Sequence, residues 1–178
     1  IFYGMKLMTQ TATPLVNNPS YQILFELFEK NPVGLLIAST FLTMAIQTSA
    51  ATIGMAIALA LAGALTLEQA IPIVLGANVG TCFTAILASL TGDVNGKRVA
   101  VAHLMVKVAG VALAMPFVGP AAEAVARLSN LLTGWLPFIQ PSTAGQIAMV
   151  HLLFNAALAL LFLPFLPMGV LFVSKLVV

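Results

Sequence analysis

Two long apolar stretches lie on either side of a short polar group in the first half of the chain. Residues 33–46 and 51–64 are almost wholly apolar, whereas Gln47, Thr48 and Ser49 between them carry amide and hydroxyl groups. Each stretch makes a helix only about 21 Å long, which is shorter than the ~30 Å hydrocarbon core of a bilayer. The two together are too long for one ordinary span. The pattern therefore predicts a re-entrant hairpin of two half-helices over residues 33–64, with the polar group at its tip.

A second interrupted apolar segment follows over residues 66–91. Thr66 and Gln69 form the signature of a capped helix start, and the apolar run after them contains two glycines around a central asparagine. Because glycine allows the backbone to unwind, we predict a broken helix whose two halves are each too short to span. The spacing of Gly76 and Gly80 is also typical of a face that packs against another helix, and this alternative stays open.

Two full spans are predicted, over residues 97–117 and 144–165, and they share a short internal echo. The sequence AHLMVK in the first resembles VHLLFN in the second. In each, a histidine is followed four residues later by a polar residue, Lys107 or Asn155, so both polar groups lie on one face of their helix. We interpret the histidines as bundle residues with satisfied hydrogen bonds rather than as proton relays. Two similar spans of this kind are expected to frame one site; chance similarity between two leucine-rich helices is the alternative.

The segment before the hairpin is expected at the edge of the membrane. Residues 1–7 are typical of the end of a membrane helix, and residues 20–30 place apolar positions at helical spacing, which predicts an interfacial amphipathic helix. A peripheral helix packed on the bundle is an equal alternative for residues 20–30. We thus divide the chain into an edge region, 1–32, and a membrane region, 33–178, and expect it to be part of a longer polypeptide or an oligomer.

Composition makes an all-α integral membrane protein the expected class. Of the 178 residues, 61% are hydrophobic and only 7% are charged, and the mean hydropathy is +1.08. A soluble domain carries about 25% charged residues, and the strands of a membrane β-barrel alternate in hydrophobicity, unlike the continuous apolar runs here. A net charge of +2 without a basic run indicates no nucleic-acid partner. The lipid bilayer is the first partner that the sequence implies.

Charged residues sort to the two expected sides of the membrane. In the loops within residues 17–32, 64–68 and 118–142, four of the six charged side chains are glutamates: Glu26, Glu29, Glu68 and Glu123, against Lys30 and Arg127. The opposite side is mostly basic, with Lys97, Arg98 and Lys175 against Asp93. Because cytoplasmic loops carry an excess of lysine and arginine, we expect a multi-pass protein of the plasma (inner) membrane whose hairpin enters from outside.

Hydroxyl, amide and backbone groups are the chemistry that the membrane segments offer, and nothing in the sequence indicates an enzyme or an organic cofactor. A half-helix that begins near Ser49 directs its N–H groups and its dipole at the hairpin tip, which favours an anion. Gln47, Thr48, Ser49 and Thr52 are therefore the candidate substrate-binding residues. Packing of small polar residues between helices is the simpler alternative for this group.

Oxygen ligands for a hard cation are expected at the second interruption. Carbonyl groups freed by unwinding at residues 76–80, together with Asn78, Thr81 and Thr84, suit a sodium ion. Lys107 is harder to interpret, because a lysine inside the membrane is costly and is a functional hypothesis by default. It could instead extend to the interface or sit neutral in the bundle.

The two polar motifs together resemble the type II sodium–phosphate cotransporter family. Residues 47–52, QTSAAT, are similar to that family's QSSSAT hairpin stretch, and residues 76–82, GANVGTC, are similar to its GANIGTT stretch. The resemblance covers about residues 32–165, which is one of the family's two inverted repeats. It implies one half of an inverted-repeat transporter that imports inorganic phosphate, or a similar oxyanion, together with sodium. The second repeat is then expected in the same longer chain or in a partner chain.

The departures from the family pattern concern hydroxyl groups and charge. Ala50 stands where a serine is usual and Cys82 replaces a threonine, so fewer hydroxyl groups remain. Lys107 stands where the repeated pattern has an asparagine, as at Asn155. We hypothesise that its ammonium group stands in for a sodium ion, or pairs with the anion, and thereby lowers the number of coupled sodium ions.

The sequence is also compatible with two other functions. A non-transporting structural subunit would use the small residues only to pack helices. Replacing Gln47 or Asn78 in such a subunit would alter assembly and reveal no ligand dependence. A sodium-coupled carrier of another small solute is the second alternative, and competition by phosphate distinguishes it.

Overall fold

The described part of the molecule is built from helices alone. The computed structural model describes residues 2–16, 18–19, 31–135 and 142–177. Its helices are α1 (Phe2–Val16), α3 (Pro32–Ile46), α4 (Ser49–Leu61), α5 (Leu67–Ser89), α6 (Val94–Ala114), α7 (Val118–Trp135), α8 (Thr143–Phe162) and α9 (Leu166–Leu176), with 3₁₀ turns at Met115–Phe117 and Leu163–Phe165. The amphipathic helix predicted at residues 20–30 lies outside the described residues.

Three helical segments of the described chain are long and apolar enough to cross a membrane. They are Leu67–Leu90, Val94–Thr133 and Thr143–Leu176. Helices α3 and α4 are also apolar but are only 15 and 13 residues long, so the two short arms expected within residues 33–64 are present. Entry of both arms from one side of the membrane, and the inverted repeat, stay predictions.

The break predicted at residues 76–80 is wrong, because α5 is one continuous helix through this stretch. The two glycines serve instead as its contact with α3. A Cβ atom at Gly76 would lie 2.1 Å from Ser39 Oγ and 2.2 Å from the Leu36 carbonyl oxygen, and a Cβ atom at Gly80 would meet the same helix at 2.6 Å. The packing alternative therefore holds, since glycine is required here for close approach of two helices rather than for unwinding.

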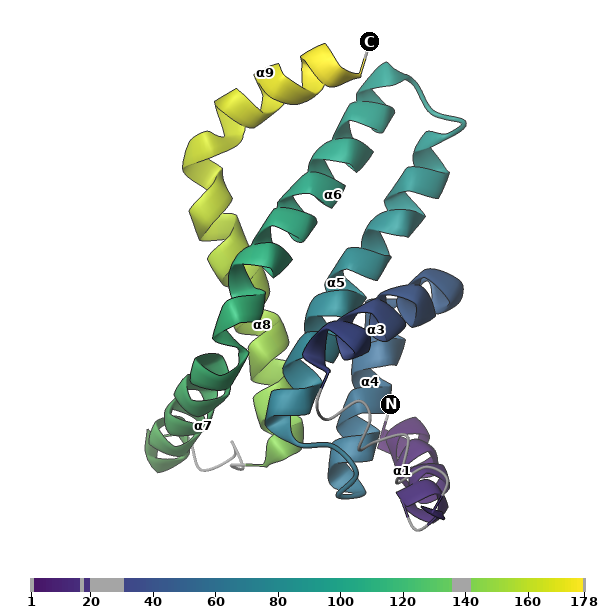
Figure 1. The fold of residues 1–178 in the computed structure, drawn as a ribbon, viewed down its shortest axis with the longest axis vertical. Helices are drawn as coiled ribbons and strands as arrows, with labels where there is room; N and C mark the ends of the chain where they lie inside the picture. The colour runs from purple at the N-terminus through teal and green to yellow at the C-terminus, as the bar shows by residue number, and fades with distance from the viewer. Residues whose placement is uncertain (1, 17, 20–30, 136–141, 178) are drawn as a thin grey trace.

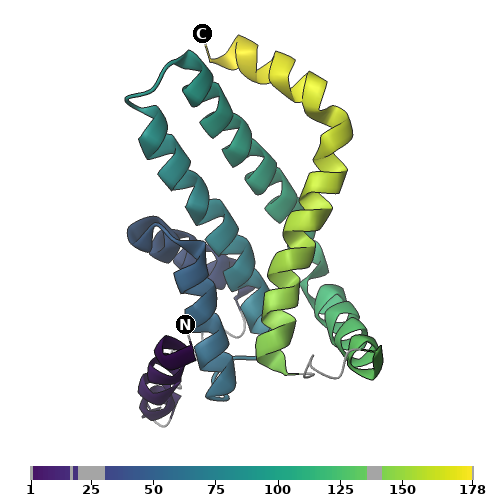
Figure 2. The ribbon, with the colours of Figure 1, turned by 180° about the vertical axis from the view of Figure 1, so that it is seen from behind.

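Helix α5 lies at the centre of the helix bundle. It packs against α3, α4, α6, α7 and α8. Helix α3 crosses it obliquely, α4 runs alongside it, and α6 returns antiparallel to it (Figure 1). The reverse view shows α8 passing beside the α5–α6 pair before the chain bends into α9 (Figure 2). The junction of α3 and α4 lies partway along α5 in both views, so the hairpin tip is placed between the two ends of the bundle.

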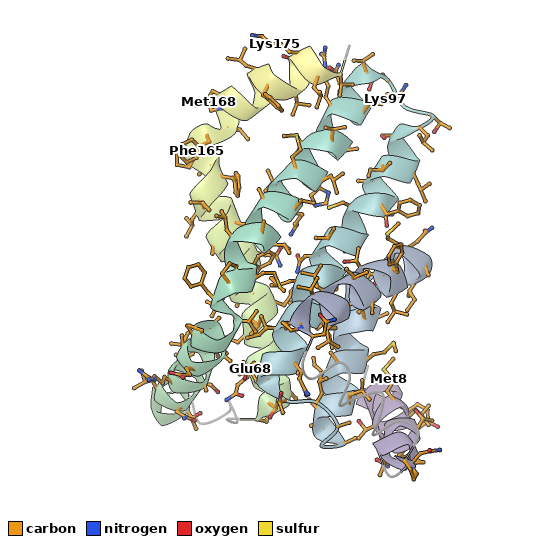
Figure 3. The ribbon with its side chains drawn as sticks, in the orientation of Figure 1. Met8, Glu68, Lys97, Phe165, Met168 and Lys175 are labelled. Carbon is orange, nitrogen blue, oxygen red and sulfur yellow. The ribbon has the colours of Figure 1, made fainter. Side chains whose placement is uncertain are left out.

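The two ends of the bundle differ in charge. Lys97 and Lys175 lie at one end and Glu68 at the other (Figure 3). Arg98 belongs to the basic end, where its guanidinium donates to carbonyl oxygens at the C-terminal end of α9, at 3.0 and 3.3 Å. A cation at that position is favoured by the helix dipole. These side chains follow the sorting expected from the sequence, whereas the membrane side that each end faces stays a prediction.

Candidate functional site

The hairpin tip leaves the first amide groups of α4 without a side-chain cap. Gln47 adopts a left-handed backbone conformation, with φ of 60°, and its N–H donates to the Thr43 carbonyl oxygen at 2.7 Å. Thr48 occupies the N-cap position of α4, but its side chain makes no capping hydrogen bond. Gln47 and Thr48 are exposed and Ser49 is half-buried. The tip therefore presents N–H groups, two hydroxyls and an amide at the positive end of a helix dipole.

Thr52, the fourth predicted substrate-binding residue, lies inside the hairpin rather than at its tip. Its side chain is 1% exposed, and its hydroxyl oxygen lies 2.8 Å from that of the fully buried Thr43. Thr43 belongs to the last turn of α3 and Thr52 to the first turn of α4. The hydrogen bond between them joins the two arms, so Thr52 positions the tip.

Replacing Thr52 by valine is expected to destabilise the hairpin by about 1–3 kcal/mol, because the buried Thr43 hydroxyl then loses its partner. Replacing both threonines by valine leaves neither hydroxyl unpaired and should cost less than the two single changes together. Thermal unfolding of the purified full-length protein in detergent measures all three variants. Strictly additive losses would show that the two hydroxyls do not depend on each other.

A cavity beside the tip connects α4 with α8. Its volume is about 470 Å³, and Ser49 and His151 line it among mostly apolar residues of α1, α4 and α8. The Nδ1 atom of His151 is buried and has no hydrogen-bond partner among the described residues. This differs from the satisfied histidine expected from the sequence, since a buried polar atom without a partner is uncommon and calls for an explanation. The VHLLFN echo was the one sequence signal that pointed to this position.

Lys107, Asn78 and Asn155 meet between three helices. The Lys107 ammonium donates to Asn78 Oδ1 at 2.8 Å and also to Asn155 Oδ1. Its nitrogen lies 5.8 Å from the ring centroid of Phe154. The lysine comes from α6, Asn78 from α5, and Asn155 and Phe154 from α8. The polar residues of the two echo segments are therefore brought together, as their shared pattern predicts.

Both asparagine amides are oriented by their own helices. Asn78 Nδ2 donates to the Val74 carbonyl oxygen at 2.9 Å, and Asn155 Nδ2 donates to the His151 carbonyl oxygen at 2.8 Å. Each amide oxygen then faces the ammonium, and a flipped amide would set an oxygen against a carbonyl oxygen. Two oriented oxygen atoms and the face of an aromatic ring make a site suited to a cation.

The other predicted sodium ligands have different surroundings. Thr81 Oγ1 donates to the Ala77 carbonyl oxygen at 2.8 Å, within α5, whereas Thr84 Oγ1 is buried without a hydrogen-bond partner among the described residues. Unwound carbonyl ligands at residues 76–80 are not present, because α5 is helical there. Within the part of the chain that the structure describes, no three His, Cys, Asp or Glu side chains gather in a way that could hold a metal ion.

Comparisons with known proteins cover most of the chain. Residues 1–136 match the family model described as Na+/Pi-cotransporter. The uncharacterised protein YqeW of Bacillus subtilis (strain 168) is 36% identical over 165 residues, which cover 92% of this chain and 50% of YqeW. YjbB of Escherichia coli (strain K12), whose name provisionally describes it as an inorganic phosphate export protein, is 28% identical over 166 residues, which cover 93% of this chain and 28% of YjbB.

The chain thus spans half the length of one of these relatives and a smaller share of the other. No solved structure matches it.

Proposed function

This chain belongs to the Na+/Pi-cotransporter family, and on that premise we propose that it is one repeat of a sodium-coupled secondary transporter for inorganic phosphate or a similar oxyanion. The observation that carries the proposal is the uncapped start of α4 at the hairpin tip. Its N–H groups and the hydroxyls of Thr48 and Ser49 are hydrogen-bond donors, and Gln47 adds an amide. An oxyanion accepts hydrogen bonds from donors of all three kinds, and the helix dipole favours its charge.

The second wall of this substrate site is proposed to come from a further repeat, in the same longer chain or in a partner chain. The cavity lined by Ser49 and His151 lies directly beside the tip, and the polar side chains in its lining support a polar ligand there. Ala50 contributes no hydroxyl, so the set of side-chain donors at the tip is small. This leaves room for an oxyanion other than phosphate.

Sodium is the proposed coupling ion, with the hydroxyl groups of α5 as its candidate ligands. The buried Thr84 hydroxyl without a partner supports that position most directly, and Thr81 lies one turn before it.

Import across the plasma membrane is the proposed direction, because a symporter moves its substrate the same way as an inward sodium gradient. The name of YjbB describes export, so the experiment must also measure the direction of phosphate transport.

Phosphate uptake into proteoliposomes that hold the full-length protein tests the proposal, with and without an inward sodium gradient. We expect sodium-driven uptake in the wild type. Ser49→Ala should raise the KM for phosphate about tenfold to a hundredfold, because a hydrogen bond to a charged group contributes about 1.5–3 kcal/mol. The matched control is Ser174→Ala in α9, whose hydroxyl donates to the Leu171 carbonyl oxygen at an exposed position.

Wild-type kinetics are expected for the Ser174→Ala control. An absence of wild-type uptake under both conditions, and under an outward gradient, would contradict phosphate transport. Other oxyanions would then be tested with the same pair of serine variants. Uptake that is equal with and without sodium would contradict the coupling alone.

A non-transporting structural subunit is the second candidate, and the contact of Gly76 and Gly80 with α3 favours it. In such a subunit the small residues only allow helices to approach closely. Gln47→Ala would then change assembly with partner chains and would not alter the binding of any anion. Equilibrium binding of radiolabelled phosphate to the purified full-length protein and to this variant separates the two functions.

A further inference from the structure

Lys107 places a half-buried cation between helices of the bundle, and none of the described carboxylates forms an ion pair with it. In the described residues the ion pair that does form joins Arg127 and Glu123, which are exposed on α7. The hydrogen bonds of Lys107 go instead to the neutral amide oxygens of Asn78 and Asn155. A charged side chain inside a membrane is costly and is normally paired or placed on a functional path.

The surroundings of Lys107 are those of a binding site for a small cation. Hydrogen bonds within α5 and α8, in which Lys107 takes no part, orient both asparagine amides so that their oxygen atoms point at one place. Neutral oxygen atoms are the ligands that a sodium ion and an ammonium group have in common, and the Phe154 ring face attracts either cation. The site is thus defined by Asn78, Asn155 and Phe154, and Lys107 fills it.

We propose that the Lys107 ammonium is a tethered cation that occupies a sodium-type site between α5, α6 and α8. This inference rests on the proposed sodium-coupled transport. A sodium ion at this place would bind and leave in every transport cycle, whereas an ammonium group attached to α6 cannot leave. The site is therefore always filled, and one sodium ion fewer moves with each substrate.

Binding of radioactive sodium to the purified full-length protein tests the inference without phosphate. Lys107→Asn removes the ammonium and supplies a further amide, so this variant should bind one more sodium ion per chain than the wild type. Lys107→Met removes the charge without adding an oxygen atom, and it should gain the same site with lower affinity. Lys107→Arg keeps a cation in the site, so it should bind the wild-type number of sodium ions.

The control is Lys97→Asn, which makes the same change at the basic end of the bundle (Figure 3). It should bind the wild-type number of sodium ions. If neither Lys107→Asn nor Lys107→Met binds additional sodium while remaining folded, the proposal is overturned and Lys107 only ties three helices together. Should Lys107→Asn fail to fold, Lys107→Met decides alone.

A second measurement addresses the transport cycle. The ratio of sodium to phosphate taken up by proteoliposomes should rise by one in Lys107→Asn and stay unchanged in Lys107→Arg. An unchanged ratio in Lys107→Asn would contradict the effect on coupling. If the wild type carries no phosphate at all, the proposed function fails, yet the sodium-binding comparison still decides whether Lys107 fills a cation site.

Discussion

Gly76→Ala is expected to lower the free energy of unfolding by about 3 kcal/mol, the upper end of the usual range for an overpacked interior. The new methyl group would lie 2.1 Å from Ser39 Oγ and 2.2 Å from the Leu36 carbonyl oxygen. The serine side chain can rotate, but the carbonyl belongs to the backbone of α3, so the two helices must separate. Separation also removes the hydrogen bond from Thr40 Oγ1 to the Gly76 carbonyl oxygen, at 3.1 Å.

Unfolding of the purified full-length protein by heat or denaturant measures this loss, and two other glycines serve as controls. A Cβ atom at Gly54 in α4 would meet nothing within 4 Å, so Gly54→Ala should be neutral or stabilising by up to about 1 kcal/mol. A Cβ atom at Gly110 would meet the end of the Leu158 side chain, which can turn away, so Gly110→Ala should cost less than Gly76→Ala. Equal losses at Gly76 and Gly54 would contradict the role of the α3–α5 contact.

Asn78→Leu is expected to destabilise the protein by about 1.5–3 kcal/mol, because the Lys107 ammonium then loses one of its two amide partners while it stays inside the bundle. The change also removes the hydrogen bond to the Val74 carbonyl oxygen. Asn130→Leu, at an exposed position of α7, is the matched control and should change stability by less than about 0.5 kcal/mol. Thermal unfolding in detergent measures both variants.

A double-mutant cycle with Lys107→Met shows how much of this loss belongs to the contact itself. With both side chains replaced, no ammonium group remains that lacks a hydrogen-bond acceptor. The double variant should therefore be more stable than the sum of the single changes predicts, by about 1–3 kcal/mol. Additivity within about 0.5 kcal/mol would show that Asn78 and Lys107 are not coupled.

Local sequence patterns were sufficient to locate most helices. The apolar lengths on either side of Gln47 predicted two short arms, which are α3 and α4. Thr66 and Gln69 predicted the start of α5, and they make the reciprocal hydrogen bonds of a capping box at 3.3 and 2.8 Å. These features depend on residues within a turn or two of each other, so neighbouring sequence contains the interactions that decide them.

The echo between the two full spans also indicated which polar residues belong together. Lys107 and Asn155 occupy matching places in their segments, and they do meet. That Asn78 would complete the contact from α5 could not be derived from spacing alone, because it depends on how three helices pack. Which atom each amide presents was likewise decided by hydrogen bonds within α5 and α8.

The sequence by itself thus determined a helical, apolar chain with short arms around a polar tip and a lysine within a span. Only the tertiary structure decided that Gly76 continues a helix and that Thr52 faces the inside of the hairpin. Glycine permits both an unwound and a closely packed backbone, and the choice follows from α3, whose Thr40 lies 36 residues before Gly76. The contact between α3 and α5 joins segments that are far apart in the chain, so no short stretch of sequence contains both partners. The sequence pattern alone therefore left both outcomes open.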